Sequence, residues 1–188
     1  HRQRDKELFH LSLVNLGTLG VISEITLNIV PSFRLHDVSN IMLLDEVIEK
    51  LDDLIYSNDH FKIWWFPHIE EAVVFRYTRT EEPVNDSKFR QWFMDEFISV
   101  GVYRILLKIG KIRRDWRKTI NGILVNKLIS PLDRTEKSFN VFNVPKPPLH
   151  RETEWAFDIK DAKDILSEYK KMINSSIHRI NFLHEIRF

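Results

Sequence analysis

The sequence predicts an α+β fold in which helices cover a predominantly antiparallel sheet. Two segments, 35–77 and 152–188, each combine extended stretches of period-two hydrophobicity with one stretch of helical periodicity. Hydrophobic residues make up 43% of the 188 residues and aromatic residues 12%, which is ample for a packed core. Two such β-α-β units favour one sheet with helices packed on one face.

The first unit contains three predicted strands and one predicted helix. The strands are expected at 35–44, 61–66 and 73–77, where the apolar pattern is extended. A helix over 46–56 follows Asp45, which can cap its first turn. The apolar face of that helix consists of residues at helical spacing: Val47, Ile48, Leu51, Leu54 and Ile55.

The second unit repeats this plan. In residues 152–159, Trp155 and Phe157 alternate with polar residues, which predicts a strand with one buried face. An amphipathic helix is predicted over 161–173 and a final strand over 178–188. We therefore expect Trp155 and Phe157 to pack against the helices of both units.

The opening of the chain reads as a tight turn followed by a strand. The turn lies between Gly17 and Gly20, and residues 21–30 alternate as a strand that Pro31 ends. Two glycines three apart most often mark only a turn, although they also let a backbone approach a ligand closely. The full Gly-x-Gly-x-x-Gly pattern of a dinucleotide fold is absent from the sequence.

Between the two units lies a segment of helical character, 89–129, which we interpret as an insertion spanning about 87–130. Its first half is aromatic and its centre is basic. Such a run is most often a solvated helical face. It also fits a helix that lies on an anionic membrane surface. Nucleic-acid binding is a weaker third option because the chain has no recognisable RNA-binding motif.

Composition excludes several classes of protein. The 28 Lys and Arg against 27 Asp and Glu give a net charge of +1, so a dedicated DNA-binding protein is not expected. The absence of cysteine removes disulfides, Cys-ligated zinc and thiol catalysis. The 8 His are too scattered to suggest a metal site, and no apolar run of about 20 residues could cross a membrane. Because the chain begins at His1 rather than Met, we expect an internal piece of a longer protein.

Several separated motifs match one known family in their order and intervals. They are LGTLGVISEIT at 16–26 with VPSFRL at 30–35, DHFKIWWFPH at 59–68, FNVFN at 139–143, EWAF at 154–157 and HEIRF at 184–188. Together they resemble the FAD-linked sugar-1,4-lactone oxidases, the L-gulonolactone oxidase and D-arabinonolactone oxidase branch of the vanillyl-alcohol oxidase superfamily.

The resemblance implies a flavoprotein that binds FAD and oxidises a sugar-lactone substrate to an ascorbate-type product, with oxygen or another acceptor. Residues 1–33 would be the C-terminal end of the FAD-binding domain, its last turn and strand. Residues 34–188 would be a substrate-capping domain that is incomplete at its C-terminus. The missing remainder of the same polypeptide would complete the cofactor site. Backbone contacts to FAD would come from Gly17, Gly20, Val21 and Ile22.

The strongest catalytic candidates are Glu185 and Arg187. Residues two apart on a strand share a face, so this carboxylate and guanidinium project together. On the residues alone, a surface salt bridge contributing at most about 1 kcal/mol is favoured. The resemblance implies that this Glu-x-Arg lies at the substrate. Arg187 would then bind sugar oxygens and stabilise negative charge, while Glu185 accepts a hydrogen bond from a hydroxyl.

A function from another class stays open at this stage. The chain could be a non-enzymatic, ferredoxin-like α+β binding module that uses its sheet or its basic helices to hold a partner. The lactone-oxidase interpretation, taken with the basic segment, also predicts a membrane-associated intracellular location at the endoplasmic reticulum or the mitochondrion. No nucleic-acid partner and no metal ligand are predicted.

Overall fold

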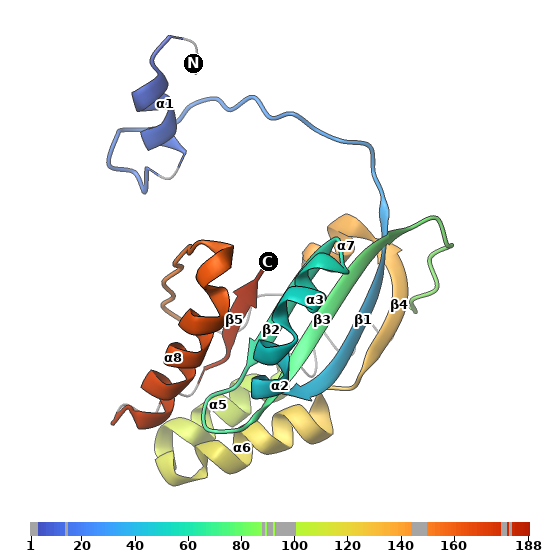
Figure 1. Ribbon diagram of the computed structural model, residues 1–188, viewed down its shortest axis with the longest axis vertical. Helices are drawn as coiled ribbons and strands as arrows, with labels where there is room; N and C mark the ends of the chain where they lie inside the picture. The colour runs from blue at the N-terminus through green and yellow to red at the C-terminus, as the bar shows by residue number, and fades with distance from the viewer. Residues whose placement is uncertain are drawn as a thin grey trace. The chain divides into compact units, whose positions relative to one another are not determined.

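The computed structural model describes residues 4–13, 15–87, 89, 92, 101–143, 150–177, 180 and 182–188. The chain consists of two compact units, His1–Pro31 and Ser32–Phe188. The larger unit is built on a five-stranded sheet, which is drawn as arrows in Figure 1.

Every neighbouring pair of strands in this sheet is antiparallel. The order across the sheet is β4 (Leu132–Lys137), β1 (Arg34–Leu43), β3 (Glu71–Thr80), β2 (His60–Trp65) and β5 (His184–Arg187). The predicted α+β class is therefore confirmed. The strands predicted at 35–44, 61–66 and 73–77 correspond to β1, β2 and β3.

One face of the sheet is covered by three helices, α2 (Leu44–Glu49), α3 (Leu51–Tyr56) and α8 (Ala162–Ser175) (Figure 1). The helix predicted over 46–56 is two short helices that meet at Lys50. Alternate residues of β2 and β3 point into this core because side chains of a strand alternate between faces. The main apolar contacts come from Val47, Leu51, Phe61, Ile63, Trp65, Ala72, Val74, Leu166 and Ile173.

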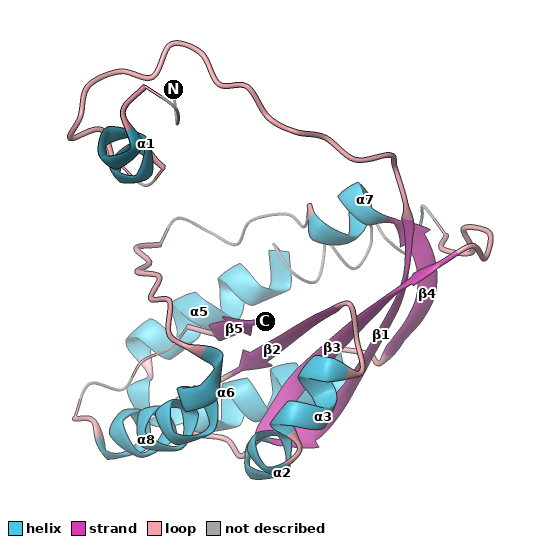
Figure 2. Cartoon of the chain, turned by 45° about the horizontal axis from the view of Figure 1, so that its top comes forward, coloured by secondary structure: helices cyan, strands magenta, loops and turns pink. Residues whose placement is uncertain are grey.

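The opposite face is covered at its two ends by other helices (Figure 2). At one end, Val73 and Phe66 pack with α5 (Tyr103–Ile112) and the π-helical turn η3 (Leu124–Leu128). At the other end, Leu35 and Tyr77 pack with α7 (Ser138–Phe142). The other helical elements in the described part of the larger unit include η2 (Arg114–Trp116), α6 (Arg117–Ile123) and η4 (Ile159–Asp161). Helical elements thus occupy residues 103–112 and 114–128 of the predicted insertion, much of whose first half lies outside the described residues.

The prediction of a strand over 152–159 is wrong. Residues 152–158 form no strand, and 75% of Trp155 and 63% of Phe157 is exposed, so neither side chain packs under the helices. The edge of the sheet is taken instead by β4, which pairs with β1. The strand predicted over 178–188 is shorter: β5 spans His184–Arg187, and Phe188 extends the backbone hydrogen bonding to Phe61 of β2 at 2.9 Å. Residues 178, 179 and 181 lie outside the described residues.

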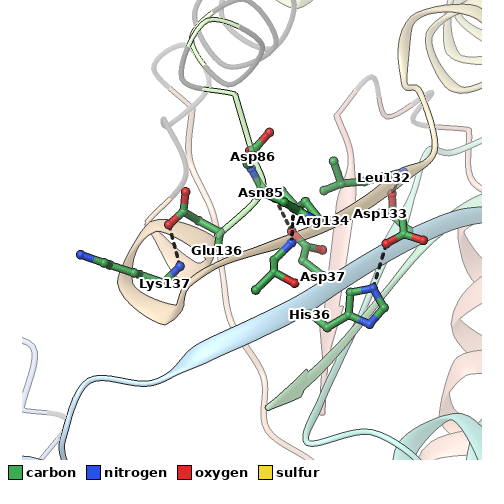
Figure 3. Close-up of polar contacts among 11 residues, drawn as sticks. His36, Asp37, Asn85, Asp86, Leu132, Asp133, Arg134, Glu136 and Lys137 are labelled. Carbon is green, nitrogen blue, oxygen red and sulfur yellow. Dashed lines mark hydrogen bonds and ion pairs between the residues drawn. The ribbon is translucent and has the colours of Figure 1, made fainter. Parts of the chain in front are cut away.

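Strand β4 is held by a buried network of polar side chains rather than by apolar alternation (Figure 3). Arg134 bridges two carboxylates: its Nε lies 3.0 Å from Oδ2 of Asp37 and its Nη1 lies 2.6 Å from Oδ2 of Asp86. The Asn85 side chain accepts a hydrogen bond from the Thr135 amide at 2.8 Å. The network therefore ties β4 both to β1 and to the segment at 85–86.

The smaller unit contains helix α1 (Lys6–Ser12), whose first turn is capped by Asp5 through the Leu8 amide at 2.9 Å. Residues 21–30 form no strand, although the sequence predicts one there. A strand needs a hydrogen-bonded neighbour, and the described part of this unit provides none. Val21 is 97% exposed. The assignment of this segment to the end of an FAD-binding domain stays a prediction.

Candidate functional site

Between its two helix-covered ends, the face opposite α2, α3 and α8 carries a set of polar and aromatic side chains. We call this set the polar band; it consists of Lys62, Trp64, Phe75, Tyr77, Glu185 and Arg187. Strand pairing brings the members together, because Lys62 lies opposite Arg187 and Trp64 opposite Glu185 in the register of β2 and β5. Directly opposed side chains on antiparallel strands are close enough to interact.

Glu185 and Arg187 share this face, in the arrangement that their spacing predicts. Nε of Arg187 lies 3.5 Å from Oε1 of Glu185, and Nη2 of Arg187 lies 2.7 Å from Oε1 of Glu154. The Arg187 side chain is 60% exposed and that of Glu185 is 37% exposed. Both charged groups are therefore accessible to a ligand. Their catalytic role stays a prediction.

Trp64 fixes the position of Glu185. Its indole Nε1 donates a hydrogen bond to Oε2 of Glu185 at 3.0 Å, while its ring packs edge-on to Phe75 with 4.7 Å between centroids. An acceptor oxygen that receives a hydrogen bond from a packed ring is held in a fixed orientation. Sequence analysis missed this bond because it joins residues 121 positions apart.

Lys62 is the second member that sequence analysis missed. Its Nζ lies 4.6 Å from the ring centroid of Phe75 and 4.8 Å from that of Trp64. Burial lowers the pKa of the Lys62 ammonium, while the carboxylates of Glu185 and Asp37 act in the opposite direction. In the sequence, Lys62 is a polar residue between two apolar neighbours, as expected at any solvent-facing position of a strand. Nothing in the sequence therefore indicates a functional role for it.

His184 lies on the other face of β5, toward α8. Its Nδ1 is hydrogen-bonded to the hydroxyl of Tyr169, and its ring lies 5.6 Å from that of Trp65. Burial lowers the pKa of His184 from 6.5 to about 4, and the neighbouring His68 adds to this effect. His184 is therefore a neutral packing residue behind the polar band at neutral pH.

This pKa predicts a specific loss of stability in acid. As pH falls below the ordinary histidine value, the unfolded chain binds a proton before folded His184 does, so the free energy of unfolding decreases between about pH 6.5 and pH 4, by at most about 3 kcal/mol. Urea unfolding of wild type and His184→Gln at the two ends of this window should show a smaller loss in the variant. The exposed His10 provides a control, since His10→Gln should behave as wild type. Equal losses in wild type and His184→Gln would contradict the assignment.

The predicted FAD contacts lie in the smaller unit. Gly17 has φ +78° and Gly20 has φ +105°, a region that side-chain-bearing residues rarely adopt. A Cβ at either glycine would meet no atom within 4 Å, so the backbone conformation and not crowding by this chain requires glycine. The segment leaves Val21 and Ile22 exposed with backbone amides that have no hydrogen-bond partner among the described residues. These features fit a turn that offers its backbone to a ligand.

Two other kinds of site are not found within the described residues. No group of three or more His, Cys, Asp or Glu there is arranged to hold a metal ion. No helix in the same ranges is long and apolar enough to cross a membrane. Peripheral membrane attachment through the basic segment stays a prediction.

Comparison with known proteins places the chain in a family. The family model described as D-arabinono-1,4-lactone oxidase matches residues 25–188. L-gulonolactone oxidase of Scyliorhinus torazame is 29% identical over 189 residues, covering 98% of this chain and 42% of that protein. L-gulono-1,4-lactone dehydrogenase of Mycobacterium tuberculosis is 26% identical over 175 residues, with 93% and 41% covered.

A yeast relative matches a shorter stretch. D-arabinono-1,4-lactone oxidase of Yarrowia lipolytica is 31% identical over 78 residues, which is 42% of this chain and 15% of that protein. The chain thus spans about two fifths of the length of the relatives that it matches over most of its own residues. Because the family model matches most of the chain, including the whole polar band, the chain belongs to the D-arabinono-1,4-lactone oxidase family.

Proposed function

We propose that the intact protein is an FAD-dependent oxidoreductase that oxidises a sugar 1,4-lactone, and that this chain supplies its substrate-capping domain. The relatives are named as lactone oxidases or dehydrogenases, which supports this reaction class. No observation favours the alternative of a non-enzymatic binding module. The observation that carries the proposal is the accessible Glu185 and Arg187 pair on the polar band.

Each side chain of the pair has a distinct task at a lactone. The Arg187 guanidinium is a planar donor that matches paired oxygens, so it binds the lactone oxygens and stabilises negative charge that develops on them. Glu185 accepts a hydrogen bond from a substrate hydroxyl, and Trp64 holds it in place for this purpose. The aromatic rings of the polar band exclude water from one side of the bound sugar, which strengthens both interactions.

FAD would supply the redox chemistry when bound, by accepting a hydride from the substrate carbon. Its backbone contacts in this chain would come from Gly17, Gly20, Val21 and Ile22. The amides of Val21 and Ile22 have no hydrogen-bond partner among the described residues, whereas the Gly17 amide donates to Oδ1 of Asn15 at 2.7 Å. In this proposal residues 1–33 end the FAD-binding domain and residues 34–188 cover the substrate. The ascorbate-type product follows from oxidation at the carbon next to the lactone carbonyl.

The proposal is tested with the full-length protein. Purified protein should show flavin absorbance, and anaerobic addition of D-arabinono-1,4-lactone or L-gulono-1,4-lactone should bleach it. The corresponding sugar acids, which lack the ring ester, serve as controls and should bleach it far more slowly. Protein that contains flavin and is reduced by none of the aldonolactones would contradict the proposed function.

A further inference from the structure

The surroundings of Lys62 are not those of an ordinary surface lysine. Its Nζ lies near three aromatic rings of the polar band, at 4.6 Å from the centroid of Phe75, 4.8 Å from that of Trp64 and 5.8 Å from that of Tyr77. Within the described part of the chain, no carboxylate forms an ion pair with it and no acceptor takes its hydrogen bonds. The three N–H donors of the ammonium are therefore available to a ligand.

A second cation lies directly opposite. Lys62 and Arg187 are register partners on β2 and β5, and like charges in this position destabilise a pair of strands. Burial and the charge of Arg187 both disfavour the charged form of Lys62, and only the carboxylates of Glu185 and Asp37 oppose them. Arg187 is paired with Glu154 and Glu185, whereas Lys62 has no carboxylate within ion-pair distance among the described residues, so the Lys62 ammonium is the cation of the two that an anion can neutralise.

The proposed reaction produces such an anion from a neutral substrate. Loss of a hydride from the carbon next to the lactone carbonyl, and of a proton from its hydroxyl, gives a 2-oxo-lactone. FAD, when bound, would accept the hydride, and the proton would pass to solvent. The enol tautomer of this product is an acid, and its conjugate base spreads negative charge over the oxygens of the lactone.

We propose that Lys62 is a third ligand-binding side chain of the polar band, and that together with Arg187 it binds the negatively charged enediolate form of the lactone product. This inference rests on the proposed function. The guanidinium of Arg187 provides N–H donors in a fixed plane, whereas the ammonium of Lys62 provides a compact positive charge. The aromatic rings keep water from the ammonium, so that a charged oxygen interacts with it more strongly than it would in bulk solvent.

The experiment separates charge recognition from a packing role by using two probes. Calorimetric titration of the full-length flavoprotein measures the Kd of L-ascorbate, an enediolate anion, and of 2-deoxy-D-ribono-1,4-lactone, a neutral lactone that lacks the reacting hydroxyl. We expect Lys62→Met to raise the Kd for ascorbate at least about tenfold and that for the neutral lactone less than about twofold. Lys62→Arg, which keeps the charge, should stay within about threefold of wild type for both probes.

A matched control comes from an exposed lysine outside the polar band. Lys50, at the end of α2, pairs with Glu46 on the side of the sheet opposite the polar band, and Lys50→Met should change neither Kd. If Lys62→Met does not fold, the same comparison is made with Lys62→Gln, with flavin content and melting temperature as readouts of folding. Unchanged ascorbate binding, or an equal loss for both probes, would overturn the inference.

Failure of this inference is distinguishable from failure of the proposed function. Wild type that oxidises lactone while Lys62→Met binds ascorbate normally would leave the function standing without an anion-binding role for Lys62. Wild type that binds ascorbate through Lys62 but oxidises no lactone would leave an anion site without the proposed reaction.

Discussion

Replacement of Arg187 by alanine is expected to lower kcat/KM for lactone oxidation at least about tenfold, which corresponds to about 1.4 kcal/mol of transition-state stabilisation. The guanidinium lies on the accessible face of β5 beside Glu185, where it can meet the oxygen on which charge develops. Steady-state kinetics of the full-length flavoprotein measures this loss. Arg187→Lys should recover only part of the activity, because it keeps the charge but cannot donate two parallel hydrogen bonds as a guanidinium does.

The fold should survive this substitution. Arg187 is mostly exposed and its ion pair with Glu154 is a surface pair, which contributes at most about 1 kcal/mol to stability. Flavin content and melting temperature should therefore change little. Arg113, which is similarly exposed and pairs with Asp115, provides the control: Arg113→Ala should leave kcat/KM unchanged. Normal oxidation by Arg187→Ala, or loss of the fold together with the activity, would rule out the catalytic role.

The largest effect on stability is expected at Arg134. Its side chain is 12% exposed and neutralises Asp37 and Asp86, whose side chains are 3% and 1% exposed. Arg134→Met keeps most of the side-chain volume but leaves two carboxylates buried without their shared cation. Removal of one partner from a buried ion pair costs about 3–5 kcal/mol. We expect a loss of that size in the free energy of unfolding, measured by urea denaturation.

A surface ion pair provides the comparison for Arg134. Lys171 pairs with Glu168 on the solvent-facing side of α8, where both side chains are more than two-thirds exposed, and Lys171→Met should cost no more than about 0.5 kcal/mol. If Arg134→Met costs as little as Lys171→Met, the buried network does not hold β4 to the sheet.

The errors in the predicted fold have a common physical cause. The pattern of β1, β2, β3 and α8 was visible in the sequence because each buries an apolar face. Residues 152–159 show a similar alternation, yet alternation does not reveal whether a strand has a neighbour to pair with. The strand β4 has the sequence LDRTEK and is held by Arg134 and its carboxylates, so it carries no apolar signal.

In the candidate site, too, local features were predictable from the sequence and long-range ones were not. The shared face of Glu185 and Arg187 follows from their spacing on one strand, and sequence alone predicts it. Lys62 and Trp64 join the pair only through the register of β2 with β5, which connects residues more than 120 positions apart. No local pattern encodes such a register. The pairing of Arg187 with Glu154 also had no sequence signal, since residues 152–158 form no strand.

In the proposed function, the polar band is the surface that binds the lactone. A crystal structure of the full-length flavoprotein with bound 2-deoxy-D-ribono-1,4-lactone tests it most directly. We expect ligand oxygens within hydrogen-bond distance, about 3.2 Å or less, of Arg187 and Glu185, with the sugar ring against the aromatic side chains of β2 and β3. A lactone bound at the flavin but out of reach of both Glu185 and Arg187 would contradict it.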